Sequence, residues 1–588
     1  MFTNILNRID FFRKVLVNSI FIIILLLIFL ALLIAPFLNS SIDKKSSILV
    51  LDGTSQSSSN SNFFDFNTGL STFQIINVIE TAQEDNEIEI ILIDSSMMSL
   101  SATDALEIGQ ALENFKATGK KVISYGDFFF QHQYLLASFA DEILINPFGL
   151  VYIEGYKDFR LYFKDALEKY KIDINTYVAG EYKSASEIFT NDSMTESTKI
   201  ESKRFLGSLW ENWVEIVSLN REDLLKISIQ NYIDDIGSLV SSDKNGSELA
   251  VSLGLADKVL NRIELEDYFL NLSDGNRKYY LNFLDYFEKI SLPESSNKLA
   301  IINAEGEIVD GDYDENNLSN GHFARLISKV KNGDFAGLLI RLNTPGGSGF
   351  ASESIRQEIL ELKKNGLPII ISMADIAASG GYWISADANE IWASPFSLTG
   401  SIGVWTAVPN FEQSLNEVGI NYDGISTTSF NPSLIKKPDA NSNLLLQNLV
   451  DSAYQDFLDL VSKGRALDRT YTDSISQGKV WDANNAKEIG LIDQIGSQRN
   501  ALDRLAELAN VKDYSIEIIE SEKNYFDQIE EYFSGIFFNY ANFFNTEKFG
   551  YTMENILNKQ KPFPFQLNLI CLESVSYTHL TLPTIFRV

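Results

Sequence analysis

The chain has little of the two residue types that most often carry metal and redox chemistry. Its 588 residues include one cysteine, Cys571, and three histidines, His132, His322 and His579. A single cysteine cannot form a disulfide within the chain, so a disulfide-stabilised fold is excluded. So few thiols and imidazoles also argue against a zinc cluster, and the sequence predicts no metal and no cofactor. A Ser-His-Asp triad is possible only if one of the three histidines lies in the right place.

Basic residues are also scarce relative to acidic ones. Lysine and arginine number 48 against 79 aspartates and glutamates, which gives a net charge of −31. A nucleic-acid-binding chain needs a basic surface, so nucleic acid is excluded as a partner. Hydrophobic residues make up 45% and charged residues 22%, which is typical of a globular chain. The length is too great for one core, and we expect two or more domains.

One long apolar run lies near the N-terminus, at residues 15–38. A bilayer-spanning helix needs roughly 20 such residues, whereas the apolar part of a cleavable signal peptide is usually about 7–15 residues long. The run therefore predicts an uncleaved transmembrane anchor; a buried core helix is the alternative. Arg8, Arg13 and Lys14 precede it, so residues 1–14 are expected in the cytoplasm and the bulk of the chain across the membrane.

The rest of the chain contains two copies of one unit. Residues 126–155 align without a gap with residues 374–403, so that Tyr134 meets Tyr382. Strands alternate with amphipathic helices in each copy, which favours an α/β fold with two tandem repeats and parallel sheets. Apolar residues at helical spacing precede both segments in matching positions: Ile108, Leu112 and Phe115 in the first copy, and Ile355, Ile359 and Leu362 in the second.

These patterns divide the chain into an N-terminal repeat at 47–290 and a C-terminal repeat at 298–511, joined by a polar stretch that contains a proline. The segment 512–571 is acidic and rich in phenylalanine and tyrosine, and we assign it no role. At 572–588 the composition changes abruptly, which we interpret as sequence that is not native to the protein; a disordered C-terminus is the alternative.

The second copy carries two glycine-rich turns, each after a predicted strand. One contains Gly346 and Gly347, in the run NTPGGS; the other contains Ser379 and Gly380, in the run ASGGY. Glycine allows positive φ and close backbone approach, so two such turns can aim amide N–H groups at one point, as an oxyanion hole requires. Ser379 lies where a strand turns into a helix, a position that suits a nucleophile. An equal alternative is that the glycines only make tight turns and that Ser379 caps the helix.

The first copy has neither feature. Gln131, His132 and Gln133 replace the Ser-Gly-Gly run, so this copy can supply no nucleophile. His132 is then a poor candidate for a base, and His322 lies in a polar loop that we expect to be solvated. A serine nucleophile needs a base, and without histidine the remaining choice is a buried lysine with a depressed pKa.

Lys183 is a lysine of the first copy that fits this role. It follows a predicted strand at the start of a helix, in the run AGEYKSA, and its aligned position in the second copy is Asn431. The first copy therefore keeps a lysine and lacks the serine, while the second keeps Ser379 and lacks the lysine. This complementary loss favours one composite site built from both halves. The alternative is an exposed lysine on a helix, the usual state of that residue.

The runs NTPGGS, ASGGY and TGSIG in the second copy, with AGEYKSA in the first, resemble those of the signal peptide peptidase A family of the long, two-repeat type. The resemblance extends over residues 47–511. Its members are membrane-anchored bacterial Ser-Lys proteases of the Clp protease and crotonase-like fold group. It implies that Ser379 is the nucleophile and Lys183 the general base. The other site residues that it implies are Ser401, as a hydrogen-bond partner of the lysine, and the oxyanion glycines Gly346, Gly347 and Gly380.

The resemblance also implies a cellular setting. Substrates would be cleaved signal peptides and other apolar peptides, which can pair with strand edges when extended. The protein would form a homo-oligomer, a tetramer for the long type. It would span the bacterial inner membrane once, through residues 15–38, with its catalytic part facing the periplasm. The alternatives are a crotonase-type acyl-CoA enzyme, which would use carboxylates, and a catalytically inactive scaffold.

Overall fold

The computed structural model describes residues 47–53, 69–240, 245–272, 279–290, 294–312, 317–425, 427, 433 and 435–520. The predicted segments 1–14, 15–38 and 572–588 lie outside these ranges, as does the part of 512–571 beyond residue 520. Within the described ranges, no helix has both the length and the apolar character that crossing a membrane requires.

The first repeat is built on a six-stranded sheet in the order β8-β5-β3-β2-β1-β9, with every neighbouring pair parallel. Its strands are β1 (Ser47–Leu51), β2 (Ile88–Asp94), β3 (Lys121–Gly126), β5 (Glu142–Ile145), β8 (Lys258–Val259) and β9 (Tyr279–Asn282). Its helices are α2 (Thr72–Glu84), α3 (Ala102–Ala117), α4 (Gln131–Ala137), α8 (Ile229–Leu239), α9 (Gly246–Ser252), α10 (Arg262–Leu272) and α11 (Phe283–Phe287). Shorter elements are η1 (Ser95–Met97), β4 (Phe129–Phe130) and β6 (Val151–Tyr152).

The second repeat has the strand order β18-β16-β14-β13-β10-β20, with β15 beside β14 and β19 beside β15. Its strands are β10 (Lys298–Glu305), β13 (Gly337–Thr344), β14 (Ile369–Ala378), β15 (Glu390–Ala393), β16 (Leu398–Gly400), β18 (Val480–Asp482), β19 (Gln494–Ile495) and β20 (Ser515–Ile518). Its helices are α12 (Asn320–Asn332), α13 (Gly349–Lys364), α14 (Gly380–Ser385), α17 (Arg469–Ile475), α18 (Ala483–Glu488) and α19 (Gln498–Leu508), and a short pair is β11 (Glu307–Val309) with β12 (Asn317–Ser319). Strand β20 pairs with β10, so this sheet continues past residue 511. The two sheets confirm the predicted α/β class.

Side chains of the central strands alternate between two cores, because successive residues of a strand face opposite sides of the sheet. In β2, Ile91 and Ile93 pack with α2 and α3, whereas Ile90 and Leu92 pack with α10. Both faces of the parallel sheet are thus covered, which explains the nearly continuous apolar sequence of its strands. The carboxyl ends of the strands then share one edge, where the loops carry functional side chains.

The predicted helices around Ile108 and Ile355 are confirmed as α3 and α13. The predicted solvated loop around His322 is wrong, because this residue lies in the first turn of α12. The hydroxyl of Ser319 accepts a hydrogen bond from the His322 amide at 3.3 Å and caps the helix. Its buried face repeats at helical spacing through Phe323, Leu326, Ile327 and Val330.

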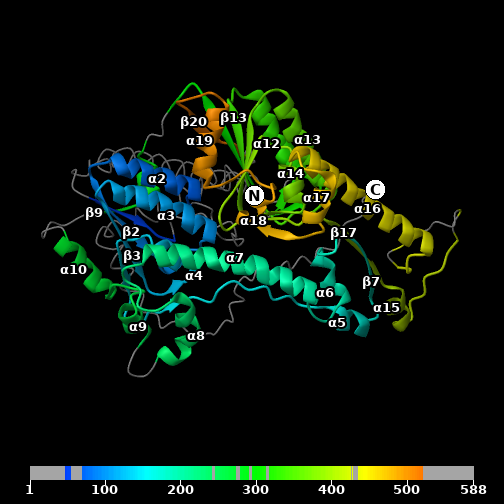
Figure 1. The fold of residues 1–588 in the computed structure, drawn as a ribbon, viewed down its shortest axis with the longest axis horizontal. Helices are drawn as coiled ribbons and strands as arrows, with labels where there is room; N and C mark the ends of the chain where they lie inside the picture. Colours follow the sequence, from blue (N-terminus) through cyan, green and yellow to red (C-terminus); the bar gives the residue numbers. More distant parts are fainter. Residues whose placement is uncertain are drawn as a thin grey trace, which may run out of the picture.

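The two repeats are joined by elements that cross from one to the other. Strand β7 (Asp173–Ala179) of the first repeat pairs antiparallel with β17 (Val404–Asn410) of the second. The long helix α7 (Glu196–Asn220) runs along both repeats (Figure 1). A lobe at the right of that view contains the β7–β17 ribbon and α16 (Ala440–Gly464), with α5 (Lys164–Lys169), η2 (Ser184–Ser186), α6 (Glu187–Thr190) and α15 (Glu412–Glu417).

A buried ion pair also links the repeats. Glu107 of α3 and Arg341 of β13 are both buried, and their charged groups lie 3.0 Å apart. Arg341 also donates to Ser372 Oγ at 2.8 Å, and Glu107 accepts from the Gln498 amide at 3.0 Å. Because β13 leads into the Gly346–Gly347 turn, this pair fixes the first repeat against the strand that carries part of the predicted oxyanion hole.

We expect Glu107→Ala to destabilise the protein by about 3–5 kcal/mol, because it leaves the buried Arg341 charge unpaired. Thermal unfolding measures this effect. Glu517→Ala is the matched control, since Glu517 and Lys298 form a 3.0 Å pair with both side chains about half exposed. That substitution should cost less than about 1 kcal/mol. Equal losses of stability in the two variants would contradict the role of the buried pair.

Candidate active site

Ser379 lies at a sharp corner between β14 and α14. Its backbone has φ 54 and ψ −116, a conformation that a residue with a side chain rarely adopts. Ser379 occupies the N-cap position of α14, but its side chain makes no capping hydrogen bond, so the alternative in which the hydroxyl serves to cap the helix is wrong. The backbone is held instead by a bond from its amide to the Gly400 carbonyl at 2.9 Å. This strained corner presents the hydroxyl away from the helix backbone, as a nucleophile requires.

Lys183 reaches Ser379 from the other repeat. It follows β7, whose last residue Ala179 pairs with Val404 at the start of β17. Its Nζ lies 3.0 Å from Ser379 Oγ, although the two residues are 196 positions apart in the chain. Lys183 is 8% exposed, so the alternative of an ordinary surface lysine is wrong.

Ser401 provides the other two contacts of the amine. Lys183 Nζ lies 2.8 Å from the Ser401 carbonyl oxygen and 2.9 Å from its Oγ. A neutral amine has two N–H donors and one lone pair. If the two oxygens of Ser401 accept both N–H groups, the lone pair remains for the proton of the Ser379 hydroxyl. The three contacts therefore match a neutral lysine acting as a base.

Burial favours that neutral form. It lowers the pKa of Lys183 from its ordinary value of 10.5 to about 7, and desolvation of the charged ammonium is the cause. A base with a pKa near the working pH has the proper protonation state and can still accept a proton. The pocket thus supplies a property that an exposed lysine lacks.

The two glycine turns of the second repeat meet beside the serine. A methyl group added to Gly346 would lie 2.8 Å from Ser379 Cβ and 2.7 Å from the Gly380 amide nitrogen. One added to Gly380 would lie 3.3 Å from the Gly347 amide nitrogen. Gly346 and Gly347 have φ 103 and 153, values that side chains disfavour. The close backbone packing brings the amides of Gly347 and Gly380 near the serine, where an oxyanion would develop.

The corresponding corner of the first repeat is filled. Gln131 occupies the position aligned with Ser379, and its side-chain oxygen accepts from the Gly155 amide at 2.8 Å. His132 is partly buried beside Tyr156, and burial lowers its pKa to about 4. A group that stays neutral and enclosed in this way is a poor shuttle for protons at neutral pH. The expectation that this copy supplies no nucleophile agrees with its side chains.

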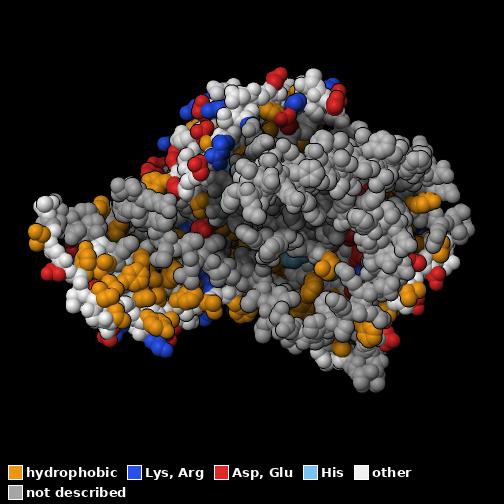
Figure 2. Space-filling model, turned by 180° about the vertical axis from the view of Figure 1, so that it is seen from behind, with side chains coloured by type: hydrophobic (Ala, Val, Ile, Leu, Met, Phe, Trp, Pro, Cys, Tyr) orange, Lys and Arg blue, Asp and Glu red, His pale blue; other side chains and the backbone are white. Residues whose placement is uncertain are grey.

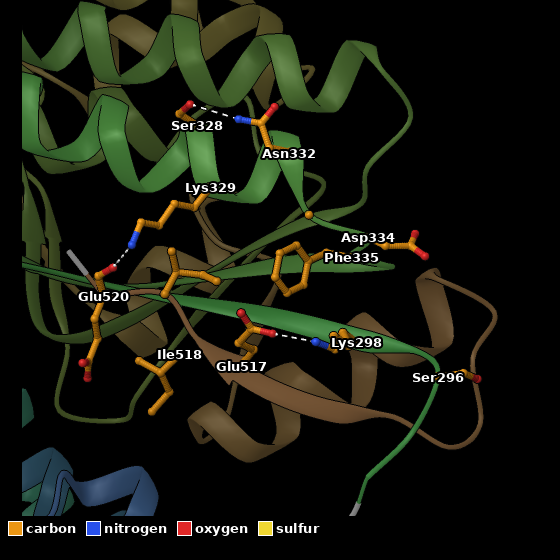
Figure 3. Close-up of a pocket in the computed structure, with 12 residues that line it drawn as sticks. Ser296, Lys298, Ser328, Lys329, Asn332, Asp334, Phe335, Glu517, Ile518 and Glu520 are labelled. Carbon is orange, nitrogen blue, oxygen red and sulfur yellow. Dashed lines mark hydrogen bonds and ion pairs between the residues drawn. The ribbon is translucent and has the colours of Figure 1, made fainter. Parts of the chain in front are cut away.

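A separate pocket of about 670 Å³ lies away from these residues, between the start of β10, the end of α12 and the end of β20. Figure 3 shows that each of its two lysines is bound to a neighbouring residue. Lys298 contacts Glu517, and Lys329 donates to the Glu520 carbonyl at 3.0 Å. Neither Ser379 nor Lys183 lines this pocket. Its chemistry does not suggest a catalytic site.

Two further features complete the description of the site. Among the residues that the structure describes, no group of three or more His, Cys, Asp or Glu side chains is arranged to hold a metal. Sequence reasoning did not single out residues 476–479 of the second repeat, which contact the loop that carries Lys183. Their only local signal is Gly478, since glycine favours turns.

Comparison with known proteins gives a consistent class. Peptidase family S49 matches residues 114–267 and 361–512. Protease 4 of Haemophilus influenzae is 38% identical over 475 residues, covering 76% of this chain and 75% of that protein. Protease 4 of Salmonella typhi is 33% identical, covering 79% and 76%. A putative signal peptide peptidase SppA of Enterococcus faecium is 32% identical, covering 38% and 67%.

Solved structures are more distant. The 1510-N membrane-bound stomatin-specific protease is 16% identical with a TM-score of 0.26, covering 39% of this chain and 100% of that one. ClpP1 of Listeria monocytogenes is 13% identical with a TM-score of 0.23, covering 34% and 94%. At these TM-scores the likeness supports no conclusion.

The sequence relatives define a serine peptidase with a duplicated domain. The chain belongs to peptidase family S49. The resemblance to the signal peptide peptidase A family is thereby confirmed, since the curated relatives include proteins named Protease 4 and SppA. Membership of a peptidase family also argues against the acyl-CoA enzyme.

We expect peptidase activity to rise with pH through about 7. Only the neutral amine of Lys183 can accept a proton, and its pKa is lowered to about 7 by burial, so the active fraction increases above that pH. The pH dependence of kcat/KM on a fluorogenic peptide measures this. A rise centred near 10.5, the ordinary value for lysine, would show that the amine is solvated.

Ser401→Ala should reduce kcat about fivefold rather than abolish activity. The substitution removes the Oγ contact to Lys183, worth about 1 kcal/mol, but keeps the contact to the backbone carbonyl. Steady-state kinetics measure the loss. Ser247→Ala is a matched control, because that buried hydroxyl donates to the Pro147 carbonyl in the first repeat. A rate equal to that of the control would remove Ser401 from the site.

Proposed function

We propose that the protein is a membrane-anchored endopeptidase that degrades cleaved signal peptides and other apolar peptides with a Ser379–Lys183 dyad. The single observation that carries this proposal is the 3.0 Å contact between Ser379 Oγ and the buried Lys183 amine. Ser401 orients the lysine, and the amides around Gly346, Gly347 and Gly380 hold the oxyanion. No metal or cofactor takes part in the proposed reaction.

Acylation begins when neutral Lys183 takes the proton of the Ser379 hydroxyl. The serine oxygen attacks the carbonyl carbon of the scissile peptide, and the negative charge on the former carbonyl oxygen is stabilised by the glycine amides. The C–N bond then breaks, and the lysine ammonium gives its proton to the leaving amine. An acyl-enzyme ester on Ser379 and a neutral lysine remain.

Deacylation repeats these steps with water. Lys183 removes a proton from a water molecule, the resulting hydroxide attacks the ester carbonyl, and the tetrahedral intermediate collapses to release the peptide acid. The lysine returns its proton to Ser379 Oγ, so the site is regenerated without net gain or loss of protons. Burial keeps the amine neutral between turnovers because it disfavours the ammonium form.

The substrate and the membrane location rest on sequence. Residues 15–38 are apolar enough to anchor the chain, and the preceding basic residues favour a cytoplasmic N-terminus, which would place the repeats in the periplasm of a bacterial cell. A peptidase fixed at a membrane surface meets apolar segments that have been cut from membrane-inserted precursors. The name of the Enterococcus faecium relative, putative signal peptide peptidase SppA, agrees with this substrate.

Assembly into a homo-oligomer, a tetramer, is also part of the proposal. The lobe around the β7–β17 ribbon carries exposed apolar side chains, which gather at the left of Figure 2. On α16, Leu444, Leu445 and Leu449 are 61%, 42% and 56% exposed. Just after α15, Val418 and Ile420 are 71% and 53% exposed. Such patches typically mark contact surfaces. With a net charge of −31, copies of the chain repel each other, so apolar contact must supply the attraction.

We expect Ser379→Ala, Lys183→Ala and Lys183→Arg to be inactive on a fluorogenic apolar peptide, with the fold retained. Alanine at 379 lacks the nucleophile, and arginine stays protonated and cannot accept its proton. Hydrolysis and labelling of Ser379 by a fluorophosphonate are the measurements. Wild-type turnover by Lys183→Arg would exclude the dyad. Faster cleavage of hydrophilic than of apolar peptides of equal length would contradict the substrate class alone.

Leu449→Glu should lower the oligomer mass, because it introduces a charge into the apolar patch. Sedimentation velocity of a variant that begins near residue 46 measures this at low and moderate salt. The same change at Leu219, which is 63% exposed on α7, is the control and should leave the mass unchanged. Salt should not dissociate the wild type, since it screens repulsion between acidic copies. An unchanged mass in Leu449→Glu would remove this patch from the interface.

A further inference from the structure

The lysine loop of the first repeat, residues 180–183, is held by a turn of the second repeat. This bridging turn, residues 476–479, connects α17 to β18. The Tyr182 amide donates to the Gln477 carbonyl at 2.7 Å. The Glu181 amide donates to the Gln477 side-chain oxygen at 3.2 Å. Two consecutive amides just before Lys183 are therefore bound by one residue.

The same turn also binds the Ser401 loop, residues 401–403 between β16 and β17. The Gly478 amide donates to the Ile402 carbonyl at 2.8 Å, and the Ser401 amide donates to the Lys479 carbonyl at 2.7 Å. Ser401 itself has φ 51, so its backbone conformation needs such external support. The bridging turn thus lies between the loop that carries the lysine and the loop that contacts its amine.

Glycine makes this close approach possible. Gly478 has φ +82, and a methyl group on it would lie 2.5 Å from the Lys183 amide nitrogen and 2.8 Å from its Cα. Gly403 packs against both the turn and the lysine, because a methyl group on it would be 3.1 Å from Gly478 Cα and 3.2 Å from Lys183 Cδ. The backbone of the turn is therefore packed directly against the lysine, with no room for a side chain between them.

The turn is anchored from behind. Gln477 has φ 53, and its side-chain amide donates to Asp473 at 2.6 Å. The Tyr454 hydroxyl, from α16, donates to the same carboxylate at 2.6 Å and accepts from the backbone N–H of Gln477 at 3.2 Å. These bonds explain how a strained conformation at Gln477 persists.

We propose that the bridging turn is a positioning element for the Lys183 base, and that Gly478 is its central positioning residue. The inference rests on the proposed Ser379–Lys183 chemistry. The turn sets how far the lysine loop projects toward Ser379, and it closes the space around the lysine stem against water. Through its backbone, the turn joins the loop that carries the base to the loop that contains Ser401.

Electrostatics near the amine is consistent with this role. The charged groups on the elements that pack here include Glu181 on the lysine loop and Lys479 on the turn, whose ammonium lies 5.1 Å from the centre of the Tyr182 ring. Arg160 donates to Ser184 Oγ at 2.9 Å, Asp473 accepts from the Gln477 side chain at 2.6 Å, and Arg204 contacts the Val480 carbonyl just after the turn. Burial is nevertheless the cause of the lowered pKa of Lys183. A change that opens the packing around Gly478 should therefore act through hydration of the amine and through its distance from Ser379.

Gly478→Ala tests the proposal. The added methyl group overlaps the Lys183 backbone, so the loop must shift; we expect kcat to fall by at least about tenfold, since displacements near 1 Å can cost more. We also expect the midpoint of the pH profile to move to higher pH, because a hydrated amine regains its ordinary pKa. The matched control is Gly366→Ala, at φ +92 with open space around the added methyl group. It carries similar backbone strain and should keep the kcat and pH midpoint of the wild type.

Tyr454→Phe is a second variant that adds no steric overlap. It removes the hydroxyl that supports Asp473 and Gln477, so it should lower kcat about twofold to tenfold and shift the pH midpoint in the same direction. Tyr286→Phe is its control, because that hydroxyl donates to Asp85 at 2.9 Å in the first repeat. This comparison decides the question if Gly478→Ala is recovered only as insoluble protein.

The outcomes separate this inference from the proposed function. If Ser379→Ala is inactive while Gly478→Ala and Tyr454→Phe match their controls in kcat and in pH midpoint, the bridging turn has no positioning role. A loss of thermal stability without a shift of the pH midpoint would equally overturn it, because a merely structural role moves only stability. If instead Ser379→Ala and Lys183→Arg stay active, the dyad itself fails.

Discussion

The arrangement of this protein depends on one requirement, that an amine be kept neutral beside a serine. Desolvation of Lys183 keeps the amine neutral, and both repeats must pack around the side chain to exclude water. The β7–β17 ribbon carries the lysine across, and the Glu107–Arg341 pair fixes the repeats against each other. The fold can therefore be understood as two α/β units whose contact surface encloses one side chain.

Much of this could be predicted from the sequence, because the signals were local or repeated. Matching apolar spacing around Ile108 and Ile355 predicted two helices, and the loss of serine in one copy and of lysine in the other singled out Ser379 and Lys183. The helix at His322 was missed because its polar first turn hides the apolar positions that follow. For the helices, the spacing of the apolar residues decided the outcome.

What could not be predicted has no local signal. Antiparallel pairing of β7 with β17 joins residues from different halves, and neither segment indicates its partner. The burial of Lys183 depends on backbone from Gly403 and Gly478, and nothing in the sequence indicates that either glycine packs against the lysine. Gln131 illustrates the converse, since its side chain fills the corner that Ser379 occupies in the other copy. Such contacts exist only after the repeats have met.

The separation of the two halves along the chain has a consequence for biosynthesis. Lys183 and Ser379 lie 196 residues apart, and the turn that holds the lysine loop follows almost a hundred residues later again, at 476–479. A ribosome-bound chain that ends before this turn contains Lys183 but lacks Gly478, which packs against it. If the dyad acts as proposed, the nascent peptidase stays inert until this turn has been synthesised, so the order of translation delays its activity.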